Sequence, residues 1–185
     1  MSRPAENAGY GQMVLRISAS LAPPLANCFR LIWSINQRYA VWSSNATVHW
    51  IRVLGGCGTV LMSHSQSGIY PFQTAVLSRK GIAGIVSIEP GACPAPTDDM
   101  APYANLPILV LFGDYVDEFP RWAPRLKNCR AFVAAANAAG GKAELLVLPD
   151  IGIKGNTHML MQDDNSLDIA DILLDWIGKH VTVVQ

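Results

Sequence analysis

Short hydrophobic runs alternate with helical patterns from about residue 57 to the end of the chain. Continuous apolar runs are typical of strands buried on both faces, and they predict strands at residues 59–62, 82–88, 108–112 and 143–148. A helical pattern follows the first, the third and the fourth of these runs. Strands that alternate with helices predict an α/β fold, in which a parallel sheet is flanked by helices.

The helix expected after residue 112 has the clearest pattern. Its apolar residues lie three or four positions apart, as on one face of a helix: Trp122, Leu126, Cys129, Val133 and Ala136. Gly140 and Gly141 end it, because glycine readily adopts the left-handed conformation at a helix C-terminus. An earlier helix is expected to run through Leu77 and to end near Lys80 and Gly81, and a last one to cover residues 166–179.

The first fifty-odd residues have weaker patterns. Residues 46–54 predict a helix, with Ser44 or Asn45 as its N-cap. Residues 29–35 and 39–42 fit either strands or a helix. The patterns in this part of the chain therefore do not assign it to the predicted sheet.

Composition and charge narrow the classes of partner. Half of the 185 residues are hydrophobic, which suits one globular domain. Fourteen basic residues balance fourteen acidic ones, so neither nucleic acid nor an anionic membrane is an expected partner. No apolar run is long enough to span a bilayer, and residues 13–26 make only a poor signal peptide.

The four cysteines have no spacing typical of a metal site, and no metal or other cofactor is expected. They are Cys28, Cys57, Cys93 and Cys129. We expect them to be small buried hydrophobic residues.

Residues 63–68, Ser-His-Ser-Gln-Ser-Gly, stand between a predicted strand and a helix. This is the layout of a nucleophile elbow, in which Ser65 lies at the tip of a sharp turn. The usual pattern is Gly-x-Ser-x-Gly, and here Ser63 and Ser67 replace the two glycines. The alternative is that Ser65 and Ser67 only cap the following helix.

His158 lies in the loop after the last predicted strand, where hydrolases with this elbow place their histidine base. His64 is expected to point elsewhere. Two acids could orient His158: Asp117, which follows the strand at 108–112, and Glu89, which ends the strand at 82–88. Asp117 also fits as a helix cap, whereas an acid that ends a buried strand has little other explanation.

Four segments resemble a known family: SHSQSGIYPF from Ser63, IVSIEPGACP from Ile85, LVLFGDYVD from Leu109 and GNTHMLMQDD from Gly155. They are similar to a bacterial subgroup of α/β-hydrolase esterases whose founding member is a secreted Alcaligenes esterase. The resemblance implies a serine hydrolase that cleaves small-molecule carboxylic esters through an acyl-enzyme, in a secreted or periplasmic location.

The resemblance also implies a role for each site residue. Ser65 is the nucleophile, His158 the base, and Glu89 the acid, with Asp117 in reserve. The backbone of Gln66 supplies one donor of the oxyanion hole. The substrate itself is not implied, and Trp122, Tyr70, Phe72 and Met159 are expected to pack in the core rather than line a pocket.

The N-terminal part departs from this family, whose members have several more strands there, a second oxyanion donor and a pair of adjacent cysteines. We therefore expect a single α/β-hydrolase domain over residues 1–185, with a truncated or divergent part at 1–56 and the catalytic half at 57–180. Missing strands would leave the strand at 59–62 as an unpaired edge, which favours a homodimer through that edge.

Two other interpretations follow from the same residues. One is a non-catalytic or truncated hydrolase remnant that lacks a complete oxyanion hole. The other is a nucleotide-binding domain, which is disfavoured because the glycines at 55–58 precede a strand and so cannot present a helix N-terminus to phosphates.

Overall fold

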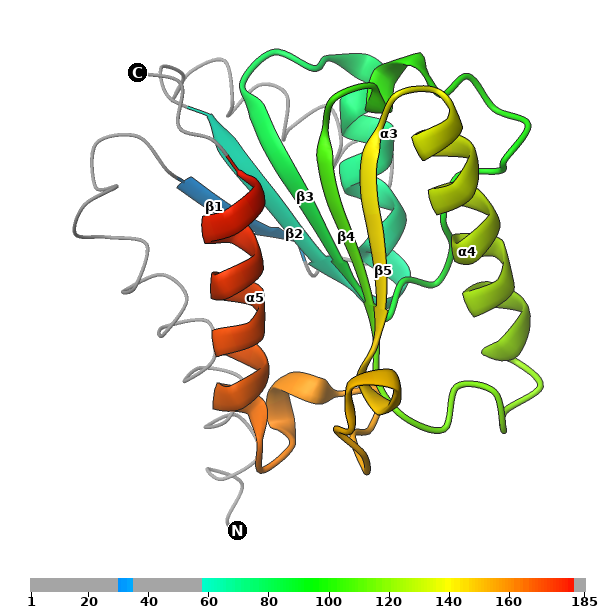
Figure 1. Ribbon diagram of the computed structural model, residues 1–185, viewed down its shortest axis with the longest axis vertical. Helices are drawn as coiled ribbons and strands as arrows, with labels where there is room; N and C mark the ends of the chain where they lie inside the picture. The colour runs from blue at the N-terminus through cyan, green and yellow to red at the C-terminus, as the bar shows by residue number, and fades with distance from the viewer. Residues whose placement is uncertain (1–29, 35–57, 182–185) are drawn as a thin grey trace, which may run out of the picture.

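The computed structural model describes residues 30–34 and 58–181. These residues contain one parallel sheet in which the order of the strands is their order along the chain (Figure 1). The strands are β1 (Arg30–Ser34), β2 (Thr59–His64), β3 (Ile82–Ile88), β4 (Pro107–Phe112) and β5 (Lys142–Val147). The α-helices are α3 (Tyr70–Leu77), α4 (Ala123–Ala138) and α5 (Ser166–His180). Short 3-10 segments are η1 (Ser65–Ile69), η2 (Ala101–Tyr103), η3 (Leu148–Ile151) and η4 (Leu160–Gln162).

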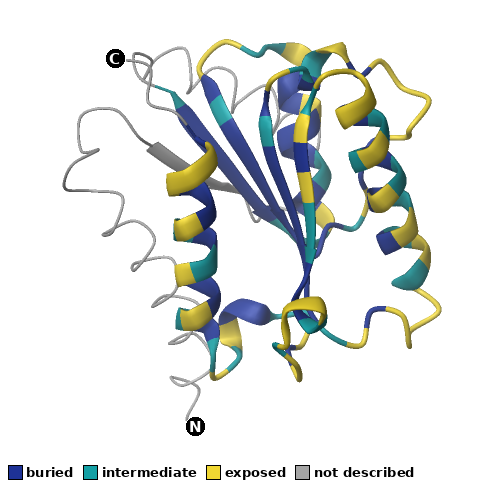
Figure 2. Cartoon of the chain, in the orientation of Figure 1, coloured by how far each residue is buried: buried dark blue, intermediate teal, exposed yellow. Residues whose placement is uncertain are grey.

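The helices cover both faces of the sheet. Successive residues of a strand point to opposite faces, so apolar residues on both faces need helices to pack against. In β2, for example, Leu61 packs toward α3 and α4, whereas Val60 and Met62 pack toward α5. β2, β3 and β4 are buried almost throughout, whereas β5 is partly exposed, and the helices bury only their inner faces (Figure 2). Apolar residues on both faces explain why the strands read as continuous hydrophobic runs.

The predicted α/β architecture from residue 57 onward is confirmed. The strand at 82–88 has the expected bounds, whereas β2 continues two residues beyond the expected end, to His64, which pairs with Ile88 of β3. Helix α4 ends before Gly140, whose φ is +84°. Its buried face differs slightly from the prediction, since Phe132 rather than Val133 is fully buried.

The expectation of an unpaired strand at 59–62 was wrong. β1 pairs with β2 in parallel, with Arg30 opposite Thr59 and Ser34 opposite Ser63. Residues 29–35 therefore contain a strand, and a homodimer through an exposed edge of β2 loses its basis. The predictions at 39–42 and 46–54 lie outside the described residues, so the single domain over 1–185 stays a prediction.

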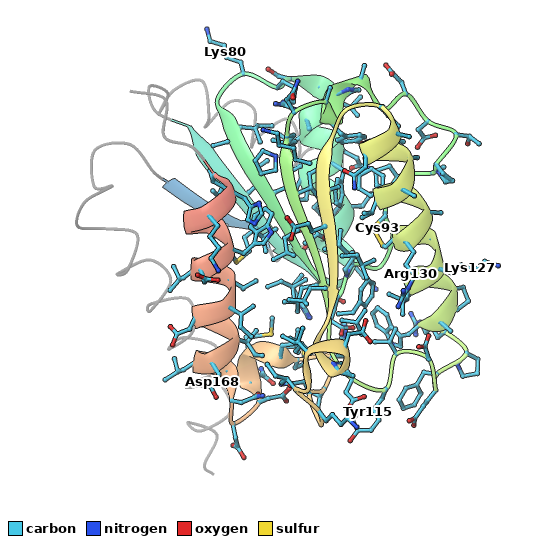
Figure 3. All side chains as sticks on the ribbon, in the orientation of Figure 1. Lys80, Cys93, Tyr115, Lys127, Arg130 and Asp168 are labelled. Carbon is cyan, nitrogen blue, oxygen red and sulfur yellow. A yellow bond between two sulfur atoms is a disulfide. The ribbon has the colours of Figure 1, made fainter. Side chains whose placement is uncertain are left out.

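The prediction for the cysteines was wrong for one pair. Cys93 and Cys129 form a disulfide between the loop after β3 and helix α4 (Figure 3). Both residues are buried, as expected, but they form a disulfide instead of remaining free thiols. Asn128 reinforces this link, because its side-chain oxygen accepts the N–H of Cys93 at 2.9 Å. The other two cysteines lie outside the described residues. No helix in the described part of the chain is long and apolar enough to cross a membrane.

Candidate active site

The carboxyl ends of β2, β3, β4 and β5 lie at one edge of the sheet, because the strands are parallel. Ser65 directly follows β2, Glu89 follows β3 and Gly113 follows β4. His158 lies in the segment between η3 and η4, after β5. The topology thus brings together residues that are up to 93 positions apart in the sequence.

Ser65 occupies a strained turn between β2 and η1. Its φ is +59°, in the left-handed region that residues other than glycine seldom adopt. The turn is tied to the loop after β3, because the Ser65 carbonyl accepts the N–H of Gly91 at 2.7 Å. This conformation is that of a nucleophile elbow rather than of an ordinary helix cap, for η1 begins without a side-chain cap.

Small residues surround the turn, as the elbow requires. Ser63 is fully buried and lies opposite Ser87 of β3. A Cβ atom on Gly68 would lie 2.6 Å from the Cα of Pro90, which leaves no room for a side chain. Ser67 is buried and donates its hydroxyl to the His64 carbonyl at 2.7 Å. Ser63 is small enough for the site of the first glycine, and Ser67 for that of the second.

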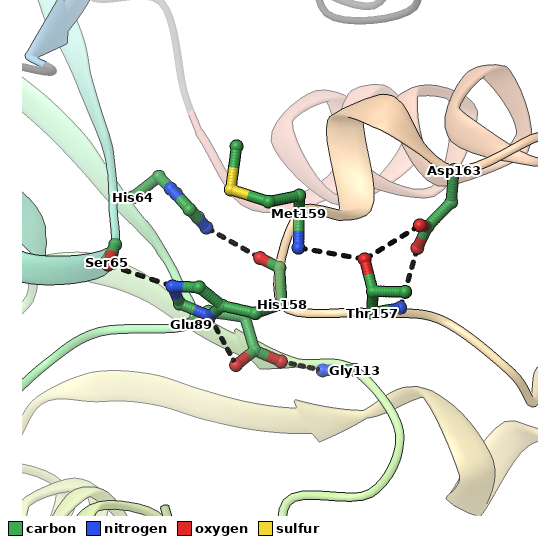
Figure 4. A network of polar contacts seen from close by, with 8 residues as sticks. All are labelled: His64, Ser65, Glu89, Gly113, Thr157, His158, Met159 and Asp163. Carbon is green, nitrogen blue, oxygen red and sulfur yellow. Dashed lines mark hydrogen bonds and ion pairs between the residues drawn. The ribbon is translucent and has the colours of Figure 1, made fainter. Parts of the chain in front are cut away.

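His158 connects the serine to the glutamate (Figure 4). Its Nε2 lies 2.9 Å from the Oγ of Ser65, and its Nδ1 lies 3.1 Å from Oε2 of Glu89. When Nδ1 carries the proton and donates it to Glu89, Nε2 is free to accept the proton of Ser65. The imidazole is 31% exposed and the glutamate side chain only 3%, so the serine end of the array faces solvent.

Glu89 is held at the end of β3 from two sides. Its backbone has a φ of +45°, and its N–H donates to the Leu111 carbonyl at 2.7 Å. Its second carboxylate oxygen, Oε1, accepts the N–H of Gly113. A Cβ on Gly113 would lie 3.1 Å from that oxygen, so a glycine lets the chain approach the carboxylate closely.

Asp117, the alternative acid, makes no hydrogen bond to His158 and is exposed. It does not cap the next helix either, because the N-cap of α4 is Trp122, without a side-chain hydrogen bond. The structure therefore brings Glu89, and not Asp117, to the histidine.

The loop that carries His158 is organised by Asp163. The Asp163 carboxylate accepts both the N–H and the hydroxyl of Thr157, each at 2.8 Å, and the side-chain amide of Asn156 at 3.0 Å. Asn156 is buried and exchanges two side-chain hydrogen bonds with Asn165. The histidine is thus presented by a loop whose preceding residues are fixed through side chains. No sequence pattern predicted this role for Asp163.

His64 contradicts the expectation that it points away from the site. Its Nε2 lies 2.8 Å from the backbone carbonyl of His158, and the two imidazole rings are 4.6 Å apart. The pKa of His64 is lowered to about 4, chiefly by burial; the bond to the His158 carbonyl opposes this effect, and the neighbouring His158 ring adds a smaller lowering. His64 is therefore neutral near pH 7.

A cavity of about 510 Å³ opens beside His158. Its apolar walls are Tyr115, Val116, Phe119 and Trp122, from the segment between β4 and α4. The Trp122 ring lies 4.4 Å from that of His158 and carries the guanidinium of Arg125 at 4.3 Å. Trp122 packs against the core, as expected, but it also lines this cavity, whereas Phe72 is fully buried in the core as expected.

Gln66 follows Ser65 at the start of η1, with an exposed side chain. A Cβ on Gly91 would lie 3.3 Å from its Cα and 3.7 Å from its backbone nitrogen, so Gly91 keeps the space beside this amide open. The resemblance places the family's second oxyanion donor in the N-terminal part, where this sequence departs from the family, and residues 1–29 and 35–57 lie outside the described residues.

The parallel sheet, the strained serine turn and the order serine, glutamate, histidine together define the α/β-hydrolase fold. Comparison with known proteins agrees. A novel bacterial esterase of known structure is 56% identical, with a TM-score of 0.72, over 76% of this chain and 43% of that protein. A carboxylesterase from Mesorhizobium loti shares the fold at 14% identity, with a TM-score of 0.60, over 96% of this chain and 85% of that one.

Among curated proteins, the probable secreted lipase phiG of a fungal species is 26% identical over a 168-residue alignment that covers 65% of this chain and 46% of the lipase. No protein-family model matches the chain. The chain spans less than half the length of this lipase and of the bacterial esterase. It has the α/β-hydrolase fold and is similar to a bacterial esterase over part of that protein's length; its place in the Alcaligenes subgroup stays a prediction.

Proposed function

We propose that the protein hydrolyses small-molecule carboxylic esters with Ser65 as nucleophile, His158 as general base and Glu89 as the acid that orients it. One observation carries this proposal: an unbroken series of hydrogen-bond distances from Ser65 through His158 to Glu89, which begins at a serine with a φ of +59°. Relatives that are themselves esterases or lipases support the same reaction.

The first half of the reaction acylates the serine. The Ser65 hydroxyl proton passes to Nε2 of His158 while Oγ forms a bond to the ester carbonyl carbon. Glu89 stabilises the resulting imidazolium through Nδ1, and its burial keeps water from competing for this contact. His158 then gives the proton to the alcohol oxygen as the carbon–oxygen bond breaks, which releases the alcohol and leaves an acyl-enzyme.

The second half reverses these roles with water. His158 takes one proton from a water molecule, whose oxygen attacks the acyl carbon, and then returns the proton to Ser65 Oγ as the acid departs. In both halves the carbonyl oxygen becomes negative, and in this proposal the backbone N–H of Gln66 donates a hydrogen bond to it. Removing one such donor costs about 10²–10³ in turnover, so the full rate needs a second donor besides Gln66.

A burst assay with a short-chain p-nitrophenyl ester tests the proposal. We expect rapid release of p-nitrophenol in proportion to enzyme, followed by slower turnover, and loss of both phases in Ser65→Ala. Ser78→Ala is the matched control, because it removes a serine hydroxyl at the end of α3, away from the carboxyl edge of the sheet.

The outcomes separate the two interpretations of the chain. Hydrolysis that persists in a folded Ser65→Ala protein would refute the assignment of the nucleophile. A folded parent protein that shows no burst would instead favour the hydrolase remnant without a complete oxyanion hole.

A further inference from the structure

His64 adjoins Ser65 and contacts the backbone of His158 without belonging to the proposed catalytic array. It precedes Ser65 in the chain, and its side chain reaches the backbone of His158 at 2.8 Å, although the two histidines are 94 positions apart. We infer that His64 is a positioning residue, which holds the loop of His158 against the nucleophile elbow through a hydrogen bond from its Nε2–H to the His158 carbonyl. This inference rests on the proposed function.

The backbone of His64 is held rigidly, so its side chain can restrain a neighbouring loop. It is the last residue of β2 and lies opposite Ile88, a fully buried residue of β3. Its own carbonyl accepts the hydroxyl of Ser67, a residue that is also buried. Its side chain therefore projects from the same rigid turn that positions Ser65.

The loop of His158 needs such a contact. The Asp163 carboxylate fixes Asn156 and Thr157, and the Thr157 hydroxyl accepts the N–H of Met159 at 3.1 Å. These bonds join the loop to itself, and Asp114 ties it to the segment after β4, because the Asp114 carboxylate accepts the N–H of Gly155 at 2.8 Å. None of these bonds reaches β2. The bond from His64 is the one that links the His158 peptide to the strand carrying the nucleophile, and it fixes the separation that the 2.9 Å contact of Nε2 with Ser65 depends on.

The chemistry requires His64 to be neutral, with its proton on Nε2. A carbonyl oxygen only accepts hydrogen bonds, so Nε2 must be the donor and Nδ1 the unprotonated nitrogen. A second positive charge 4.6 Å from His158 would oppose formation of the imidazolium during acyl transfer. Burial lowers the pKa of His64 to about 4, which keeps the ring neutral at the pH of the reaction.

Two substitutions separate positioning from bulk. His64→Leu fills a similar space without a donor, whereas His64→Gln keeps an N–H donor at the end of a side chain of comparable reach. We expect His64→Leu to lower kcat for a p-nitrophenyl ester by about ten- to a hundredfold with little change in KM, since a small misplacement of a catalytic group has an effect of this size. His64→Gln should restore most of kcat.

The same variants are compared by the rate at which a fluorophosphonate labels Ser65, with thermal unfolding measured in parallel. Equal labelling of His64→Leu and the parent would overturn the inference, as would a His64→Gln protein as slow as His64→Leu at equal stability. A parent that is not labelled at Ser65 would instead overturn the proposed function.

Nitrogen-15 NMR of the histidine rings tests the proposed hydrogen bond without an activity measurement. We expect His64 to be the Nε2–H tautomer at pH 7, and we expect the His158 ring signals to shift in His64→Leu but stay near the parent values in His64→Gln. A His64 ring protonated on Nδ1 alone, or His158 signals unchanged in His64→Leu, would contradict the proposed bond.

Discussion

Removing the Cys93–Cys129 disulfide should cost a large part of the stability of this domain. The bond closes a loop between residues 36 positions apart, and the chain-entropy relation gives roughly 4 kcal/mol for a loop of this length. Small domains have a free energy of unfolding of about 5–15 kcal/mol, so this loss is severe but need not prevent folding. The perturbation is the double substitution Cys93→Ala and Cys129→Ala, since a single substitution leaves a reactive thiol.

Urea unfolding of the parent and the double variant measures the difference. Dithiothreitol added to both proteins gives a second comparison. It should also destabilise the parent by roughly 4 kcal/mol, and any effect on the double variant comes from Cys28 and Cys57 alone. A difference below about 1 kcal/mol between the oxidised parent and the double variant would refute the reasoning, because the closed loop would then not be what stabilises the fold.

Three further predictions concern the surroundings of His158. The pKa of His64 is about 4 in the folded protein and has its ordinary value of 6.5 in the unfolded chain, so the unfolded chain binds more protons between these two values. The free energy of unfolding therefore falls as the pH drops from 6.5 to 4. Urea unfolding should show that His64→Gln loses roughly 3 kcal/mol less than the parent over this range. Asp163→Ala should lower kcat at least about tenfold by freeing the loop before His158, whereas Asp164→Ala, at an exposed neighbour, should leave it unchanged. Trp122→Ala should raise KM for aryl esters more than for methyl esters in initial-rate assays, because it removes one apolar wall of the cavity.

The fold from residue 57 onward was predictable because its strands are buried on both faces. Runs such as residues 82–88 are apolar on both faces and therefore lack the one-sided polar pattern of a surface helix. The glycines at 140 and 141 mark the end of α4. The residues that meet at the site were predictable for a related reason. Parallel strands place their carboxyl ends at one edge, so an elbow, an acid and a histidine after successive strands must lie near one another.

The features that the sequence did not reveal depend on side-chain directions and on pairings between distant segments. The hydrogen bond from His64 to His158 depends on the direction in which the His64 side chain points from the turn, and the periodic pattern of the sequence does not predict that direction. The disulfide joins a loop to a helix, and the spacing of Cys93 and Cys129 alone does not specify that contact. The contribution of β1 to the sheet was equally hidden, because residues 29–35 fit a strand and a helix alike.

The most direct test of the account is to identify the atom that carries the acyl group. The parent protein is incubated briefly with p-nitrophenyl acetate, quenched in acid, digested and analysed by mass spectrometry, beside Ser65→Ala and Ser78→Ala. The account predicts an acetyl group on the peptide that contains Ser65, present in the parent and in Ser78→Ala and absent from Ser65→Ala. An acetyl group on another residue, or its absence from a folded protein that still releases p-nitrophenol, would contradict it.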